Sequence, residues 1–368
     1  MSSLYRSPVS SLRSSGFGHL HVDRRPSTVD RRRYNGDMHL REVNVGCVGG
    51  GTGLPSLLGG LKANPWLKLN AVVTMFDSGG SSGQLRDQLG VLPPGDVLKC
   101  ALALARNERE ARSVLLARLP ALDPRDRLGG HTGGNLLLSM MERYSGDFLS
   151  AVDSLRALLG CKGRVWPVTV ELASVCAEYA DGTRTRGEVE VDAGQSRGHE
   201  VRRLWLEPQV SIHPEVAHAI RTFDAVIIGP GSFFTSLLPP LLVLGVREAI
   251  ADVRGPIILI TNLLTEGHGM EGFTAAEAVR WVERAIGRRV DVVIANNSRP
   301  SAGVLKNYAA EHKAPLELGE LDPSVEAVLG PFWKSDIARH DRRRLAFAVW
   351  AVLSQRLMTK SPSTVMLG

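Results

Sequence analysis

The stretch VNVGCVGGGTGLPSLLGGLK, residues 43–62, joins a short apolar run to a leucine-spaced run through a glycine-rich turn. The apolar run predicts a buried β-strand. Pro55 falls in the first turn of the helix that follows, where its missing N–H costs nothing. Glycines at such a junction let the backbone approach an anion, and the start of the helix offers unpaired N–H groups. The stretch therefore predicts a strand–turn–helix unit that binds phosphate, with a turn that serves only packing as the alternative.

This turn matches known nucleotide motifs only in part. The Walker A pattern G-x-x-x-x-G-K-[ST] is absent, which disfavours nucleotide hydrolysis of the P-loop type. Gly51, Gly53 and Ser56 fall at the three spacings of the dinucleotide fingerprint, and Asp77 ends a second predicted strand, where an acid would bind ribose. Residues 77–90, DSGGSSGQLRDQLG, then differ from an ordinary dehydrogenase, because they form a second glycine- and serine-rich anion loop.

Length, composition and charge narrow the class of protein. The chain has 368 residues, 43% of them hydrophobic, so it can bury the core of one large α/β domain with or without a subdomain. The formal net charge is +6, but arginines crowd the first 33 residues and supply much of the excess. The folded part is therefore closer to neutral, and we expect no nucleic-acid partner.

The chain divides into three parts. Residues 1–40 are rich in Ser and Arg and poor in large aliphatic residues, which predicts a disordered basic tail. A nucleic-acid arm, an organelle transit peptide and a start at Met38 are alternatives for this segment. Residues 41–355 are predicted to form one nucleotide-binding domain with a β-rich insertion over about 163–210, and residues 356–368 a flexible C-terminus.

From residue 43 onward, strand-like and helix-like segments alternate. Continuous apolar runs predict strands covered on both faces at residues 43–48, 69–76, 223–229, 255–261 and 290–296. Helices are predicted at residues 93–105, 274–287 and, broken near Gly146, over 133–160. Short alternating runs over 165–191, with an Asp-Gly turn at residues 181–182, predict an antiparallel insertion.

The predicted fold class is a three-layer α/β/α, Rossmann-like, doubly wound and mostly parallel sheet with a β-rich insertion. Ligands of such sheets bind at the carboxyl ends of the strands. Two more glycine-rich motifs, GPGSFFTS at residues 229–236 and GGHTGGN at 129–135, follow a predicted strand and open a predicted helix. Four motifs of this kind in one chain predict a composite cleft for a ligand with several phosphates.

The candidate ligand-binding residues come from these four motifs, from the segment after Asp77 and from the end of the predicted strand 255–261. They are Gly49, Gly50, Gly51, Thr52, Gly53, Asp77, Gly79, Gly80, Ser81, Ser82, Arg86, His131, Asn135, Gly229, Gly231, Ser232, Thr235 and Asn262.

The roles of individual polar residues stay open at this point. Asp77, the candidate catalytic residue, could coordinate Mg²⁺, bind ribose, act as a base or form an Asx turn. His131 could be a general base, a phosphate donor or a turn histidine satisfied by the backbone. Asp96 lies in the first turn of a predicted helix, where contact with the helix dipole alone would explain it.

The sequence also predicts the compartment. Its four cysteines include no C-x-x-C pair and no histidines at zinc spacing, which is typical of reduced thiols in a cytoplasmic protein. No apolar run reaches the roughly 18 residues of a membrane span, and residues 1–37 lack the apolar core of a secretory signal. We therefore expect a cytoplasmic protein.

Six motifs of the chain, over about residues 43–345, occur together and in this order in one known superfamily. They are GGGTGLPSLLGGLK, FDSGGSSGQLRDQLGVLPPGDVLKCALAL, LGGHTGGNLLLSMMERYSGDF, DAVIIGPGSFFTSLLPPLLVLGVREAI, ITNLLTEGHGMEGFTAAEAVRWVERAIG and VDVVIANN. The chain resembles the superfamily that joins the gluconeogenesis factors (YvcK type) to 2-phospho-L-lactate transferase (CofD type). The resemblance implies a Rossmann-like fold and a nucleotide-diphosphate cleft lined by the glycine-rich loops.

The two branches of this superfamily imply different functions. The regulatory branch binds UDP-sugars and affects carbon flux, cell-wall synthesis and cell shape, whereas the transferase branch moves a phospholactyl group from a guanylylated donor to a deazaflavin with Mg²⁺. The segments GGSSGQLR and PPGD resemble the regulatory branch. Two positions depart from the family pattern: Ser78 follows Asp77 where paired acids are common, which weakens the case for Mg²⁺, and Gly134 replaces a larger residue.

We therefore expect a nucleotide-sugar-binding regulator and a homo-oligomer. Gly49–Gly53 and Gly229–Ser232 would hold the diphosphate of a UDP-sugar, GDP or NAD-like ligand, and Asp77, Asn135 and Asn262 would read the sugar or base. No cofactor is expected to be required, although Mg²⁺ could take part. The alternatives are Mg²⁺-dependent transfer of a phospholactyl-type group and, less favoured, NAD-dependent redox chemistry.

Overall fold

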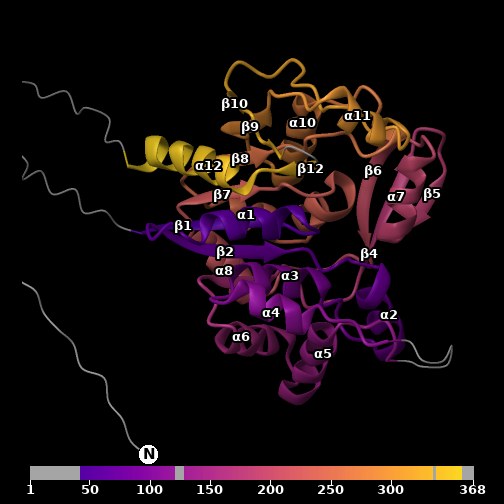
Figure 1. Ribbon diagram of the computed structural model, residues 1–368, viewed down its shortest axis with the longest axis vertical. Coiled ribbons are helices and arrows are strands. Elements are labelled where there is room, and N and C mark those ends of the chain that lie inside the picture. The colour runs from indigo at the N-terminus through magenta and orange to yellow at the C-terminus, as the bar shows by residue number, and fades with distance from the viewer. Residues whose placement is uncertain (1–41, 121–127, 335–336, 359–368) are drawn as a thin grey trace, which may run out of the picture. The chain divides into compact units, whose positions relative to one another are not determined.

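The computed structural model describes residues 42–120, 128–334 and 337–358 (Figure 1). Contacts divide the chain into two units, residues 1–39 and 40–368, and every described residue belongs to the second unit. The predicted basic tail over 1–40 lies outside the described residues, as does the predicted flexible C-terminus beyond residue 358.

A sheet of seven strands forms the centre of this unit, in the order β10-β9-β8-β7-β1-β2-β3. The strands are β1 (Val43–Gly49), β2 (Leu67–Val73), β3 (Arg164–Pro167), β7 (Ala225–Ile228), β8 (Ile257–Ile260), β9 (Val292–Asn296) and β10 (Glu326–Gly330). Each neighbouring pair is parallel. The chain builds outward from β1 in one direction and later returns to build outward from β7 in the other. The switch point of this doubly wound sheet therefore lies between β1 and β7.

Helices cover the sheet because each parallel crossover must pass over one of its faces. All four residues of β7 and all four of β8 are buried, as expected for strands covered on both faces. The helices are α1 (Gly53–Leu61), α2 (Gly80–Leu89), α3 (Gly95–Leu104), α4 (Glu108–Leu115), α5 (Gly133–Ser145), α6 (Phe148–Leu158), α7 (Glu188–Ser196), α8 (Pro214–Arg221), α9 (Val246–Ala251), α10 (Ala275–Ile286), α11 (Ala302–Ala309) and α12 (Arg342–Leu357). Shorter turns are η2 (Phe233–Leu237), η3 (Pro239–Leu242) and η4 (His268–Met270).

Several predicted helix boundaries are confirmed. The predicted helix 93–105 is α3, and the predicted pair over 133–160 is α5 and α6. Gly146 ends α5 with φ 72°, a left-handed conformation that glycine adopts without strain. The segment 77–90 was predicted as a loop, whereas GGSSG begins helix α2. Serines and glycines are frequent at helix starts as well as in loops, so composition could not separate the two.

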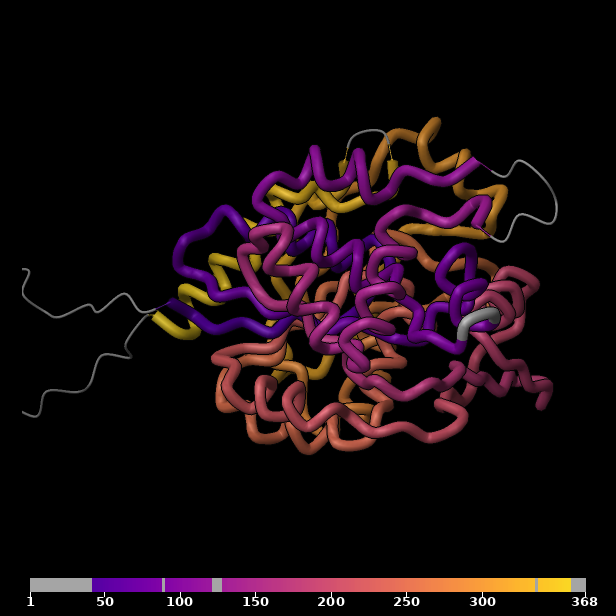
Figure 2. Tube along the Cα trace, turned by 90° about the horizontal axis from the view of Figure 1, so that it is seen from below, coloured from indigo at the N-terminus to yellow at the C-terminus, as the bar shows by residue number. Residues whose placement is uncertain are grey.

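The last helix lies beside the first (Figure 2). A Cβ added at Gly60 of α1 would lie 2.6 Å from the carbonyl oxygen of Arg342, so only glycine lets the start of α12 approach this closely. The contact brings the basic C-terminal segment, including the two-stranded hairpin of β11 (Trp333–Lys334) and β12 (Ile337–His340), to the edge of the sheet where β1 ends.

A small antiparallel sheet follows β3 and is visible at the right in Figure 1. It consists of β4 (Ser174–Tyr179), β5 (Arg184–Arg186) and β6 (Val201–Glu207), with the predicted Asp-Gly turn between β4 and β5. Two expectations within 165–191 were wrong. Residues 164–167 form β3 of the parallel sheet, and residues 188–191 begin α7 rather than a strand. Alternation over four residues fits one turn of a helix as well as a strand, so the pattern could not decide.

Candidate functional site

The first and third glycine-rich motifs meet at the switch point of the sheet. The motif at residues 49–53 links β1 to α1, and the motif at 229–236 leaves β7, the strand that pairs with β1. A Cβ added at Gly53 would lie 2.3 Å from the carbonyl oxygen of Pro230, which only glycine permits. Gly51 (φ 63°) and Gly229 (φ 84°) adopt left-handed conformations for the same turns.

These loops form one wall of a large cleft. The cleft has a volume of about 1140 Å³ and is lined on this wall by Gly51, Thr52, Gly53, Gly231 and Ser232. Helix α1 begins here with no acidic residue in its first turn, and Thr52 makes no capping hydrogen bond with its side chain. The start of α1 therefore presents the positive end of its dipole to the cleft.

The C-terminal part of the cleft lining, at Lys334, Arg339, Arg342 and Arg343, is a basic wall that sequence reasoning missed. Among the described residues that line the cleft, seven are Lys or Arg and three are Asp or Glu. The basic residues are Lys99, Arg112, Lys313, Lys334, Arg339, Arg342 and Arg343. The run ARHDRRR at 338–344 was the available signal, but only the fold brings it to the cleft. A cleft with this excess of positive charge attracts an anionic ligand.

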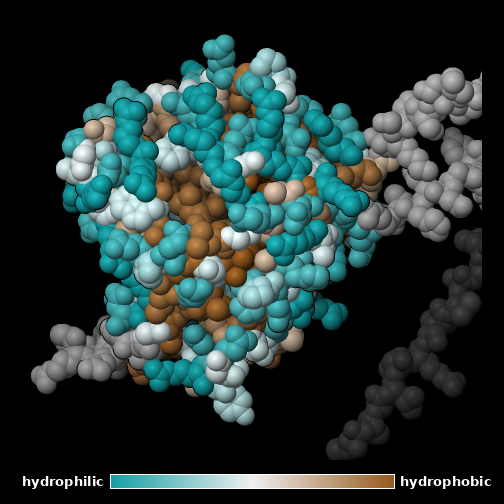
Figure 3. All heavy atoms as spheres, turned by 180° about the vertical axis from the view of Figure 1, so that it is seen from behind, coloured by the Kyte–Doolittle hydropathy of each residue, from teal (hydrophilic) through white to brown (hydrophobic). Residues whose placement is uncertain are grey.

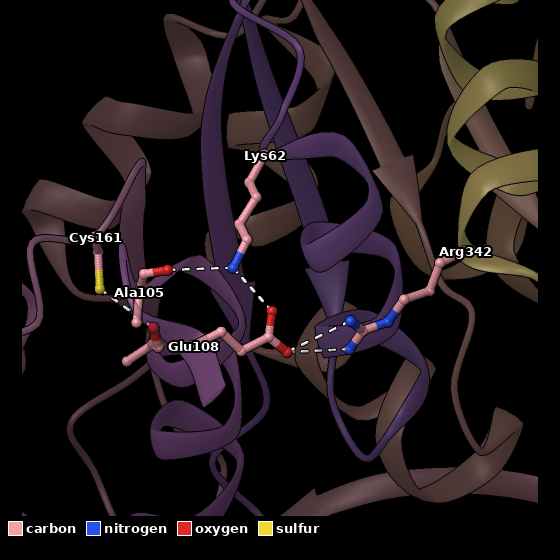
Figure 4. Close-up of polar contacts among 6 residues, drawn as sticks. Lys62, Ala105, Glu108, Cys161 and Arg342 are labelled. Carbon is pink, nitrogen blue, oxygen red and sulfur yellow. Dashed lines mark hydrogen bonds and ion pairs between the residues drawn. The ribbon is translucent and has the colours of Figure 1, made fainter. Parts of the chain in front are cut away.

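Glu108 fixes the start of α12 in this wall (Figure 4). Its carboxylate accepts hydrogen bonds from Lys62 at 2.8 Å and from the guanidinium of Arg342 at 3.3 Å. Burial raises the pKa of Glu108, but the hydrogen bonds and charges of Lys62 and Arg342 outweigh burial and hold that pKa below its ordinary value. An ionised Glu108 therefore joins α1, α4 and α12.

Asp96 supports the loop after β1. The N–H of Gly51 donates to its carboxylate at 2.7 Å, and Lys99 donates to the other oxygen at 2.8 Å. Burial lowers the pKa of Lys99, but the charge and hydrogen bond of Asp96 outweigh it, so the pKa lies above its ordinary value. A Cβ at Gly50 would lie 2.6 Å from Asp96, so this glycine also permits the contact.

Glu266 supports the loop after β7 and was missed from the sequence. The N–H of Phe233 donates to both of its carboxylate oxygens, at 3.0 and 2.9 Å, and Ser232 donates to one of them at 3.2 Å. Asn262 donates to Glu266 at 2.7 Å and to the carbonyl of Gly231 at 2.9 Å. The acid four residues after the strand-end Asn262 was the signal that could have found it.

Thr235 completes this cluster below the loop. It is buried, and its hydroxyl lies 2.6 Å from that of Ser232. The side chain of Thr235 also hydrogen-bonds Asp192 of α7. Burial, and to a smaller degree the charge of Asp192, raise the pKa of Glu266 to about 7 against the opposing hydrogen bond from the N–H of Phe233.

Asp77 lies to one side of the cleft. Its carboxylate accepts the N–H of Gly79 at 2.8 Å, and Glu188 of α7 hydrogen-bonds both Asp77 and the N–H of Ser78, the latter at 3.1 Å. Burial and the charge of Asp77 raise the pKa of Glu188 to about 9. Glu188 therefore carries a proton at neutral pH. Glu188 lines the cleft and Asp77 does not.

These contacts bear on the predicted magnesium ligand. Asp77 makes its hydrogen bonds within the protein, to the N–H of Gly79 and to Glu188. Within residues 42–120, 128–334 and 337–358, no group of three or more His, Cys, Asp or Glu side chains is placed to hold a metal ion. We derive no step through Mg²⁺, and its participation stays a prediction.

The other two motifs meet in a separate, buried cluster. Ser81 of α2 lies 2.9 Å from Nδ1 of His131 and accepts a hydrogen bond from Asn135 of α5 at 3.0 Å. His131 is 1% exposed, and none of the three residues lines the cleft. Ser82 is also buried. A Cβ added at Gly95 would lie 2.2 Å from the hydroxyl oxygen of Ser82, so the two residues are in close contact.

The remaining candidates of this region do not line the cleft either. Gly79 precedes α2 and Gly80 begins it with φ 49°. Arg86 pairs with Asp87 at 3.0 Å. The structure thus gathers the motifs of β1 and β7 in the cleft and those of α2 and α5 in a buried polar cluster.

Comparisons with known proteins agree with this fold. Residues 45–332 match the family model described as 2-phospho-L-lactate transferase CofD. The chain is 35% identical over 333 residues to a protein of Aquifex aeolicus named "Putative gluconeogenesis factor", covering 87% of this chain and 100% of that one. It is 33% identical over 313 residues to the "Gluconeogenesis factor" of Bacillus subtilis, covering 83% and 96%.

A solved structure of a related protein has the same fold. A crystal structure of a UPF0052-family protein from Bacillus halodurans superposes with a TM-score of 0.77 at 32% identity, covering 84% of this chain and 99% of that chain. The chain is thus a doubly wound, Rossmann-like α/β protein with a cleft at the switch point of its sheet. The chain belongs to the CofD family, and curated relatives that match most of its length are named gluconeogenesis factors.

Proposed function

We propose that this protein is a cytoplasmic, nucleotide-sugar-binding regulator linked to carbon metabolism, cell-wall synthesis and cell shape. The observation that carries the proposal is the cleft of about 1140 Å³ between the loops of β1 and β7 and the basic wall. A diphosphate with an attached sugar matches this arrangement, because helix N–H groups face it from one side and arginines from the other.

The position of the ligand follows from the groups that line the cleft. The diphosphate would lie along the N-terminal turn of α1, at Thr52 and Gly53, and along the loop after β7, at Gly231 and Ser232, with Arg339 and Arg343 also lining the site. Amide groups accept and donate hydrogen bonds to sugar or ribose hydroxyls. Asn262 therefore keeps its predicted role of binding the sugar or base. Asp77 and Asn135 do not line the cleft, so this proposal gives them no contact with the ligand.

Calorimetry with UDP-N-acetylglucosamine tests this proposal. We expect saturable binding that Gly51→Arg abolishes, because the new side chain would enter the cleft. Gly90→Arg is the matched control, since Gly90 has nearly the same φ (65° against 63°) and nothing lies within 4 Å of its Cβ position. A flat titration of the unmodified protein, with GDP-mannose and NAD also silent, would contradict the proposal.

Group transfer is the second candidate, and the match to the transferase family model is the observation that favours it. Incubation with UDP- or GDP-linked donors, with Mg²⁺ or with EDTA, separates the two candidates. We expect binding without release of nucleoside monophosphate. Release that requires Mg²⁺ and is lost in Asp77→Asn would instead establish the transferase.

Location and assembly remain parts of this proposal. No helix in the described parts of the chain is both long and apolar enough to cross a membrane. The face behind that of Figure 1 carries a band of apolar residues between polar margins (Figure 3). Val114 of α4 and Met140 and Tyr144 of α5 are also more than half exposed. A homo-oligomer would cover such surface, and sedimentation of the purified chain tests whether one forms.

A further inference from the structure

An anion already occupies the loop to which the proposed function assigns a phosphate. The carboxylate of Glu266 accepts from the N–H of Phe233 on both oxygens, from Ser232 at 3.2 Å and from Asn262 at 2.7 Å. Backbone N–H, hydroxyl and amide donors at the end of a strand are the groups that bind phosphate oxygens in other proteins. Glu266 therefore uses the donors that a phosphate at this loop would need.

The loop after β1 also has a carboxylate as a hydrogen-bond acceptor, but there the negative charge is paired. Asp96 accepts a hydrogen bond from the N–H of Gly51, and Lys99 forms an ion pair with the same carboxylate at 2.8 Å. Glu266 has no ion pair with any described residue. Its negative charge is therefore uncompensated and would repel a second anion brought against Ser232.

The groups that face Glu266 from the neighbouring elements do not remove this charge. Asp192 of α7 adds a negative charge on the side of Thr235. Lys313, after α11, acts in the opposite direction, but it is paired with Glu311 at 2.6 Å. A proton on the carboxyl group is the remaining way to neutralise it. Because burial raises the pKa of Glu266 to about 7, solvent can supply that proton near neutral pH.

Protonation also changes what Glu266 can do. A carboxylate only accepts hydrogen bonds, whereas a carboxylic acid donates one and still accepts others. The protonated side chain can keep the N–H of Phe233 on one oxygen and donate from the other to a phosphate oxygen. The same residue thus repels the ligand when it is charged and binds it when it is neutral.

We propose that Glu266 is an internal anion of the β7 loop, and that binding of a diphosphate to this loop takes up one proton from solvent onto its carboxylate. This inference rests on the proposed nucleotide-sugar site. It makes the protein a sensor whose affinity for its ligand falls as pH rises through neutrality.

The test is calorimetry of the full chain with UDP-N-acetylglucosamine from about pH 6 to about pH 8.5, in buffers of different ionisation enthalpy. The probe is a diphosphate diester, so its own charge is constant over this range. With a pKa of about 7, uptake of about 0.5 proton is expected at pH 7 and about 0.9 at pH 8. The affinity should fall up to about tenfold per pH unit above 7.

Variants test whether the proton taken up on binding goes to Glu266. Glu266→Gln keeps the shape of the side chain and should bind without proton uptake, with an affinity independent of pH and about tenfold tighter than that of the unmodified protein at pH 8. Asp192→Asn and Glu188→Gln each remove another carboxyl group with a raised pKa and should leave the proton uptake in place.

Two further results have distinct meanings. Binding by the unmodified protein without proton uptake, or with an uptake that persists in Glu266→Gln, overturns this inference and leaves the proposed function standing. Absence of binding at every pH, with GDP-mannose and NAD also silent, overturns both. The uptake is measured on the unmodified protein, so the first of these results does not depend on the folding of a variant.

Discussion

Two pairs of glycine- and serine-rich motifs behave differently in this protein. The pair at residues 49–53 and 229–236 meets at the switch point of the sheet and opens onto the cleft. The pair at residues 79–82 and 129–135 meets at the starts of α2 and α5. It forms a buried polar cluster, in which Ser81 hydrogen-bonds both His131 and Asn135.

Small residues permit close approach in both pairs, so composition alone cannot tell them apart. In the first pair, backbone lies against backbone at Gly53 and Pro230, and the start of α1 is left facing an open space. In the second pair, buried side chains satisfy their polar groups among themselves. A glycine-rich motif therefore predicts close packing, and its partners decide whether a ligand can bind.

The largest effect is expected from Gly53→Ala. Its methyl group would lie 2.3 Å from the carbonyl oxygen of Pro230, so the two loops must separate. We expect UDP-sugar affinity to fall at least about 100-fold, which corresponds to about 2.7 kcal/mol. Calorimetry measures this loss. Gly303→Ala is the control, because Gly303 has no positive φ and the nearest atom to an added methyl group would lie 4.0 Å away. Unchanged affinity in Gly53→Ala would contradict the comparison.

His131→Ala should separate stability from binding. The substitution leaves a cavity and unpaired hydroxyl and amide groups in a buried cluster, which should cost about 2 kcal/mol of unfolding free energy. UDP-sugar affinity should change by less than about twofold, since His131 does not line the cleft. Urea denaturation and calorimetry measure the two quantities. A large loss of affinity at unchanged stability would place the second pair in the binding site.

The basic wall should contribute less per residue. Arg339 and Arg343 are exposed and line the cleft without an ion pair to any described residue. Replacing both with Ala should weaken UDP-sugar binding by about tenfold and flatten its dependence on salt. The control replaces Arg202 and Arg203 with Ala, because both are exposed arginines of β6 that do not line the cleft. Equal effects of the two double variants would show that only the net charge of the protein matters.

The smallest expected effect concerns Glu188 and stability. Its pKa of about 9 in the folded protein lies above the ordinary value of 4.5, so the folded state binds the extra proton between these values. The contribution of Glu188 to stability is therefore fully present below pH 4.5 and is lost as pH rises toward 9. Glu188→Gln should stabilise the protein at pH 8, where keeping a proton on Glu188 costs free energy, and most of this gain should be lost by pH 5. Thermal unfolding at both pH values measures this, and an equal gain at both would contradict the raised pKa of Glu188.

The sequence was sufficient for the features that depend on local pattern. Continuous apolar runs predicted the parallel strands, and glycine at the ends of β1 and β7 predicted the two loops at the switch point, because each signal lies within a few residues. Residues 188–191 were misassigned because four alternating residues fit both a strand and a helix. Arg339 and Arg343 were missed because they lie far along the chain from Gly51, and only the packing of α12 on α1 brings them to the cleft.

A crystal structure of the protein with UDP-N-acetylglucosamine tests the central claim most directly. The account predicts diphosphate density at the start of α1, beside Thr52 and Gly53, and at the loop after β7, beside Ser232, with the ligand's hydroxyls near Asn262. Density beside Ser81 and His131, with the cleft at the switch point empty, would contradict it.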